Sequence, residues 1–93
     1  MLCKIERSFA RWGANAFRVS GELRGDGVKI LEELLLNVRH RVALDLKEVT
    51  LTDRHAVALL ALCERNGGQL LNCPAYLREL VTYEQANVQS ERK

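Results

Sequence analysis

The sequence predicts an α/β fold: one small domain with a mixed four-stranded sheet and about three helices. Two early segments alternate apolar and polar residues, which is typical of half-buried strands. Apolar residues recur at helical spacing in three later segments. The elements follow in the order β-β-α-β-α-β-α, which favours an N-terminal antiparallel hairpin followed by mainly parallel strands with helical crossovers.

The first third of the chain predicts a hairpin and a helix. Leu2 to Ala10 alternates weakly, and the turn Trp12-Gly13-Ala14-Asn15 follows because Gly and Asn tolerate positive φ. Ala16 to Leu23 alternates clearly and predicts a half-buried strand. Gly25-Asp26-Gly27 ends it, with Asp26 as a good N-cap for the next helix. The predicted buried residues of that helix are Val28, Ile30, Leu31, Leu34, Leu35 and Val38.

The middle of the chain predicts a buried strand that runs into a second helix. Arg41 to Val49 is β-rich and apolar at Val42, Leu44, Leu46 and Val49. Either Thr52 or Asp53 caps the helix. Asn66-Gly67-Gly68 ends it, because glycine accepts the left-handed conformation at a helix C-terminus. The apolar residues of this helix are numerous enough to predict deep burial: Val57, Leu59, Leu60, Leu62 and Cys63.

A short strand and a third helix complete the pattern. Gln69 to Asn72 predicts a strand at a sheet edge, where we expect a second copy, as a homodimer, or a partner protein to cover open backbone groups. Pro74 fits the first position of a helix that runs to about residue 88, because the missing N–H costs nothing there. A polar tail, 85–93, follows the domain core. The predicted buried residues of this helix are Tyr76, Leu77, Leu80, Val81 and Val88.

Length and composition indicate a globular protein without a nucleic-acid partner. The 93 residues suit one domain, and 47% of them are apolar. Fourteen basic and twelve acidic residues give a net charge of +2, which does not suggest the clustered basic face that nucleic acid requires. The densest basic stretch, Arg39-His40-Arg41, fits a solvated turn. The absence of a long apolar run or signal peptide argues against membrane insertion and for a cytoplasmic location.

The residues that could carry chemistry suggest neither an enzyme nor a bound cofactor or metal. Cys3, Cys63 and Cys73 match no zinc spacing, so we expect buried free thiols. No nucleophile motif is present, and His55 has no partner ligands in the sequence. Asp45, within a strand, is expected to bond nearby backbone.

The segment Leu44-Asp45-Leu46-Lys-Glu-Val49-Thr-Leu51-Thr-Asp53-Arg54-His55-Ala56 resembles the switch segment of STAS domains, the family of bacterial anti-anti-sigma factors. That family pattern ends in Asp-Ser-Ser-Gly after an alternating strand. Phe17-Arg-Val-Ser-Gly-Glu-Leu23 and Asn66-Gly-Gly-Gln-Leu-Leu-Asn-Cys-Pro74 also resemble family motifs. The resemblance covers a core of about residues 15–84, and the element order is the same.

The resemblance implies a non-catalytic protein-interaction module in bacterial signalling or regulation. In the anti-anti-sigma branch a partner kinase phosphorylates the second serine, which corresponds to His55 here. Because Arg54 and His55 carry no hydroxyl, we do not expect that switch. The expected interaction loop is Thr52, Asp53, Arg54, His55 and Ala56. The partner implied is an anti-sigma kinase-like protein, a sensor or a transporter complex.

Other interpretations remain open from the sequence. The N–H groups of residues 54–57, with Arg54 as a clamp, could hold a small anion or nucleotide at the start of the second helix. The chain could instead be an accessory STAS subunit of a transporter. The loop could also have drifted after losing regulation. An enzyme ranks last.

Overall fold

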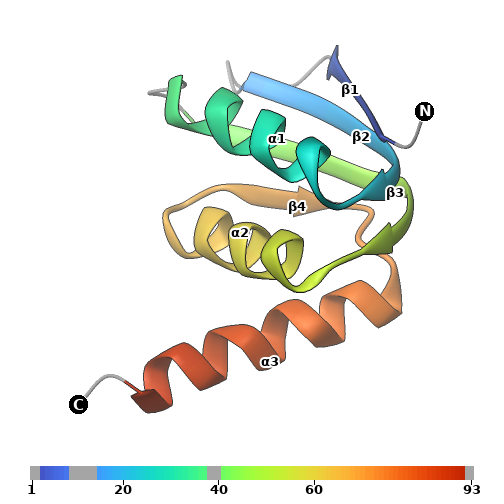
Figure 1. Ribbon diagram of the computed structural model, residues 1–93. Coiled ribbons are helices and arrows are strands. Elements are labelled where there is room, and N and C mark those ends of the chain that lie inside the picture. Colours follow the sequence, from blue (N-terminus) through green and yellow to red (C-terminus); the bar gives the residue numbers. More distant parts are fainter. Residues whose placement is uncertain (1–2, 9–14, 38–40, 92–93) are drawn as a thin grey trace.

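The computed structural model describes residues 3–8, 15–37 and 41–91, with side chains through residue 86 (Figure 1). The observed order is β-β-α-β-α-β-α, which confirms the predicted α/β class and sequence of elements. The elements are β1 (Cys3–Ser8), β2 (Asn15–Leu23), α1 (Asp26–Asn37), β3 (Val42–Thr52), α2 (Arg54–Arg65), β4 (Gln69–Leu71) and α3 (Ala75–Glu91).

The four strands form one mixed sheet in the order β1-β2-β3-β4. β1 runs antiparallel to β2, whereas β3 runs parallel to both β2 and β4. Crossovers between parallel strands are right-handed, so α1 and α2 lie on the same face of the sheet. α2 lies between α1 and α3 (Figure 1). β4 is an edge strand, as predicted, whereas self-association through it stays a prediction.

The core lies between the sheet and the helices. The alternation correctly predicted the core residues that β2 contributes, because Phe17, Val19 and Leu23 are buried while Arg18 is exposed. The four predicted apolar positions of β3 are also buried. The largest fully buried side chains are Leu23, Leu31, Leu44, Leu46, Leu60, Leu77, Val19 and Val81.

The helices bury narrower faces than the sequence predicted. Ile30 is 54% exposed, Leu62 is 49% exposed, and Tyr76 and Leu80 are each 44% exposed. These four predictions of burial were wrong, because each helix covers its neighbours with one narrow stripe while its flanking apolar positions face solvent. Leu34, Leu35, Leu59 and Cys63 are half-buried. Val38 and the Val88 side chain lie outside the described residues.

Several predicted boundaries were displaced. The Gly25 carbonyl accepts the Lys29 N–H at 3.3 Å, so Gly25 takes the N-cap position and Asp26 is the first helical residue. The Pro74 carbonyl accepts the Arg78 N–H at 2.8 Å, so Pro74 precedes the first helical position instead of occupying it. β3 continues three residues beyond Val49. α3 extends through Glu91, so most of the predicted tail is helical.

Part of two predicted turns cannot be compared with the structure. Residues 9–14 include most of the first predicted turn and the end of the first predicted strand, and both lie outside the described residues. Residues 38–40, which include most of the predicted turn Arg39-His40-Arg41, also lie outside the described residues. The described part of Leu2 to Ala10 forms β1, as predicted.

The three cysteines are free but only half-buried, so the prediction of buried free thiols was partly right. Partial burial raises the pKa of each thiol above its usual value. Asp45 acts as predicted on neighbouring backbone, because its carboxylate accepts the Lys47 N–H at 3.1 Å.

A polar cluster holds α3 against α2. The Arg78 guanidinium donates two hydrogen bonds to the Glu64 carboxylate, at 2.9 and 3.0 Å. Gln85 Nε2 donates to the same carboxylate at 3.1 Å. The hydrogen bond from Arg78 is the main cause of a lowered Glu64 pKa. Beneath this cluster, Leu77 and Val81 bury the contact face of α3.

The end of α2 depends on two adjacent glycines. Gly67 adopts a left-handed φ of 100° and donates its N–H to the Glu64 carbonyl at 3.1 Å. Gly68 donates to the Cys63 carbonyl at 2.9 Å. These two bonds form a Schellman motif, which confirms the predicted glycine end of this helix. A Cβ at Gly68 would lie 2.6 Å from Cys63 Sγ and 2.9 Å from its carbonyl oxygen.

Gly68→Ala is therefore expected to lower the free energy of unfolding by about 1–2 kcal/mol, because the methyl group overpacks the turn. Urea denaturation measures the change. Cys63→Ala in the same chain removes the Sγ contact but leaves the carbonyl contact, so the double variant should lose less than the sum of the two single losses. A Gly68→Ala protein as stable as the parent would contradict this packing.

Candidate functional site

The predicted interaction loop lies where two parallel strands end side by side. Leu23, the last residue of β2, is paired with Thr52, the last residue of β3. The carboxyl ends of neighbouring parallel strands meet at one edge of a sheet. The turn that starts α1 and the loop that starts α2 are therefore neighbours.

Asp53 joins the two loops. It is the N-cap of α2, and Oδ1 accepts the Ala56 N–H at 2.8 Å. Oδ2 accepts the Gly25 N–H from the neighbouring turn at 3.2 Å. In addition, the Asp53 N–H donates to the Leu23 carbonyl at 3.4 Å. One residue thus caps a helix and fixes the relative position of two connections.

The same hydrogen bonds favour the charged form of this carboxylate. Desolvation acts to raise the pKa of Asp53, but the N–H groups of Ala56 and Gly25 and the nearby His55 together outweigh it. The pKa is therefore lowered, and Asp53 carries its negative charge at neutral pH.

The remaining loop residues divide into exposed and structural ones. Arg54 and His55 occupy the first turn of α2 and are exposed, as expected of contact residues. Ala56 is fully buried, so it packs in the core and offers no contact surface. Thr52 is half-buried at the end of β3. Of the five residues predicted to form the contact loop, only Arg54 and His55 are exposed, and Asp53 holds the turn on which they lie.

A shallow hollow of about 680 Å³ lies beside Asp53. It is lined by Arg24, Gly25, Asp26, Gly27, Ile30 and Cys3 as well as Asp53. Gly27 allows this arrangement, because a Cβ there would lie 2.9 Å from Cys3 Cβ. From the sequence, Gly25-Asp26-Gly27 was predicted to end a strand and to provide an N-cap at Asp26. Its position beside Asp53 follows from the pairing of the strand ends, which is a long-range contact.

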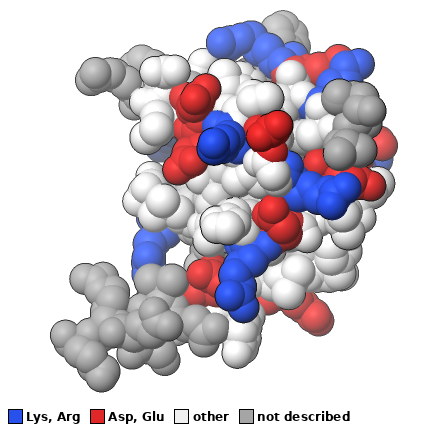
Figure 2. Space-filling model, in the orientation of Figure 1, with Lys and Arg blue, Asp and Glu red and all other residues white. Residues whose placement is uncertain are grey.

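The structure adds little support for other kinds of site in the described part of the chain. No group of three or more His, Cys, Asp or Glu residues there could hold a metal ion. On the face drawn in Figure 2, Lys and Arg are interspersed with Asp and Glu and form no basic patch. None of the described helices is long and apolar enough to cross a membrane.

Comparisons with known proteins identify no relative: the chain matches no family model, no curated protein and no solved structure.

Proposed function

We propose that this chain is a non-catalytic, STAS-like protein-interaction module of bacterial signalling or regulation, acting in the cytoplasm. The observation that carries the proposal is the fixed start of α2. Asp53 holds this turn through hydrogen bonds to Ala56 and Gly25, while Arg54 and His55 face solvent. A rigid turn with exposed charged side chains loses little entropy when a partner binds.

The arrangement also favours a protein partner over a small anion. Of the four N–H groups at residues 54–57, Ala56 already donates to Asp53 Oδ1 and Val57 donates to the Asp53 carbonyl. The Asp53 carboxylate adds a negative charge where an anion would have to bind. An anion sensor would have to overcome both features.

The resemblance suggests the class of partner. Anti-anti-sigma factors bind an anti-sigma kinase and are released when their serine is phosphorylated. Here Arg54 and His55 stand at the two serine positions. The module we propose binds its partner, an anti-sigma kinase-like protein, a sensor or a transporter complex, without that release.

The joint replacement Arg54→Ala and His55→Ala tests the proposal. Partners are first captured from the native cell with the parent chain, and their affinity is then measured by titration. We expect the double variant to weaken binding by about tenfold or more, since contact residues of this kind contribute a large share of binding energy. Arg65→Ala, an exposed arginine at the opposite end of α2, is the matched control and should bind like the parent. Unchanged affinity in the double variant would refute the surface assignment.

A further inference from the structure

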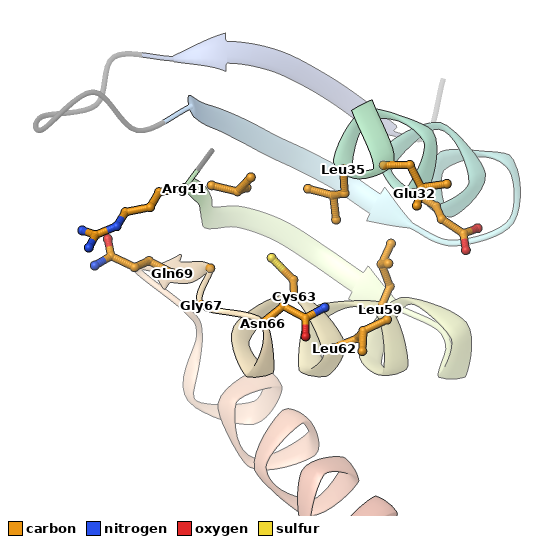
Figure 3. Close-up of a pocket in the computed structure, with 12 residues that line it drawn as sticks. Glu32, Leu35, Arg41, Leu59, Leu62, Cys63, Asn66, Gly67 and Gln69 are labelled. Atoms are coloured by element: carbon orange, nitrogen blue, oxygen red, sulfur yellow. The ribbon is translucent and has the colours of Figure 1, made fainter. Parts of the chain in front are cut away.

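A second hollow of the described molecule lies away from the loop, between α1 and α2. It is an open groove of about 800 Å³, which we call the α1–α2 groove. Figure 3 shows Leu35 reaching into it from α1, and Leu59 and the Cys63 thiol from α2. Its apolar lining consists of Leu35, Leu36, Val42, Leu59, Leu62 and Cys63.

Two of these leucines lie on its rim in contact with solvent. Leu36 is 77% exposed and Leu62 is 49% exposed. They lie on opposite walls, one on each helix. Single exposed leucines are common on protein surfaces, but exposed leucines on both walls of a concave apolar surface are typical of a binding site.

The ends of the groove carry opposite charges. Arg41 and Gln69 lie at one end and Glu32 at the other (Figure 3). Within the described residues, neither Arg41 nor Glu32 takes part in an ion pair. The complementary surface is an apolar one with an acidic group at one end and a basic group at the other.

Backbone hydrogen bonding indicates which kind of occupant fits. The long walls are helices, whose backbone groups bond within the helix, so an extended peptide would find no strand edge to pair with along these walls. A helical peptide pairs its backbone N–H and C=O groups within itself and needs no such edge. A small acyl ligand would remain partly in water, whereas small-molecule sites bury about 70–90% of their ligand. Each wall has 12 residues, about 18 Å, which matches three turns of a bound helix.

We infer that the α1–α2 groove binds an amphipathic helix of a partner protein, with its apolar face on the six lining residues. An acidic residue at one end of that helix meets Arg41, and a basic residue at the other meets Glu32. This surface is separate from Arg54 and His55, and the inference does not depend on that loop. It gives the molecule a second contact region for the same partner or a different one.

The probe is a displayed library of peptides of about 14 residues, with apolar residues fixed at helical spacing and other positions random. It is selected on the full chain. Recovered peptides should carry an acid near one end and a base near the other. Leu36→Glu and Leu62→Glu should each weaken their binding by about tenfold or more. Leu80→Glu, which alters a leucine on α3 about as exposed as Leu62, is the matched control and should leave binding unchanged.

Circular dichroism first establishes that each variant keeps its helices. Arg41→Glu should weaken binding of the recovered peptides. Replacing the acidic residue of the peptide with a basic one should restore that binding. Failure to recover any peptide would overturn the inference, as would peptides that bind both groove variants like the parent. Binding lost in the Arg54→Ala, His55→Ala protein but kept in the groove variants would move the contact to the loop. One-to-one binding of sodium dodecanoate in the groove without any peptide binding would assign it to an acyl chain instead.

Discussion

Replacing Leu60 with alanine is expected to lower the free energy of unfolding by about 3–5 kcal/mol. Leu60 is fully buried on the face of α2 that packs against the sheet. The substitution removes apolar contacts and leaves a cavity, because the surrounding close-packed side chains relax only partly. Domains of this size are stable by roughly 5–15 kcal/mol, so the loss is a large fraction of the total.

Leu62→Ala provides the control within the same helix. It makes the same chemical change two positions away, where the side chain is 49% exposed. We expect a loss of less than about 1 kcal/mol, because removing a side chain that is largely in contact with solvent leaves no cavity in the core. Urea or thermal denaturation of both variants measures the difference. Equal losses at the two positions would contradict the orientation of α2.

This pair of leucines also shows how far the sequence could predict the fold. Strand alternation has a period of two, so a strand residue is either on the core face or off it. The predicted core positions of β2 and β3 were accordingly correct, from Phe17 to Val49. Helical spacing indicates the direction of an apolar face but not its width. Ile30, Leu62 and Leu80 were predicted to be buried because they flank the central stripe, and they are exposed.

The candidate site was predictable only in its local part. The sequence restricted the N-cap to Thr52 or Asp53, because either residue before an apolar helical segment is a common helix start, and the structure places the cap at Asp53. The bond between Asp53 and Gly25 joins residues 28 positions apart and depends on the parallel pairing of β2 with β3. The α1–α2 groove was missed for a similar reason. Its walls are two helices whose separation is set by the sheet, and the spacing of apolar residues along the chain does not predict that separation.

Asp53→Ala is expected to lower the free energy of unfolding by about 1.5–2.5 kcal/mol. The loss combines about 1 kcal/mol for a missing N-cap with about 0.5–1.5 kcal/mol for the hydrogen bond from the Gly25 N–H, an exposed donor that water can satisfy when Asp53 is removed. Asp53→Asn separates the two effects. The Asn side chain has one acceptor oxygen where the Asp carboxylate has two, so it can keep the bond from Ala56 or the bond from Gly25. This variant should therefore lose about half as much stability as Asp53→Ala.

The pH dependence of stability provides a further test of Asp53. Its folded-state pKa is lowered, so its carboxylate contributes stability that is fully present above the unfolded value of about 3.9 and is lost as pH falls through the folded-state pKa. Glu64, held by Arg78, contributes in the same direction in both proteins. The stability difference between the parent and Asp53→Asn should therefore shrink on acidification, as measured by urea denaturation at a series of pH values. A difference that stays constant down to the lowest pH would mean that the charge of Asp53 does not hold the two loops together. The start of α2 would then lack the rigidity on which its role as a contact surface depends.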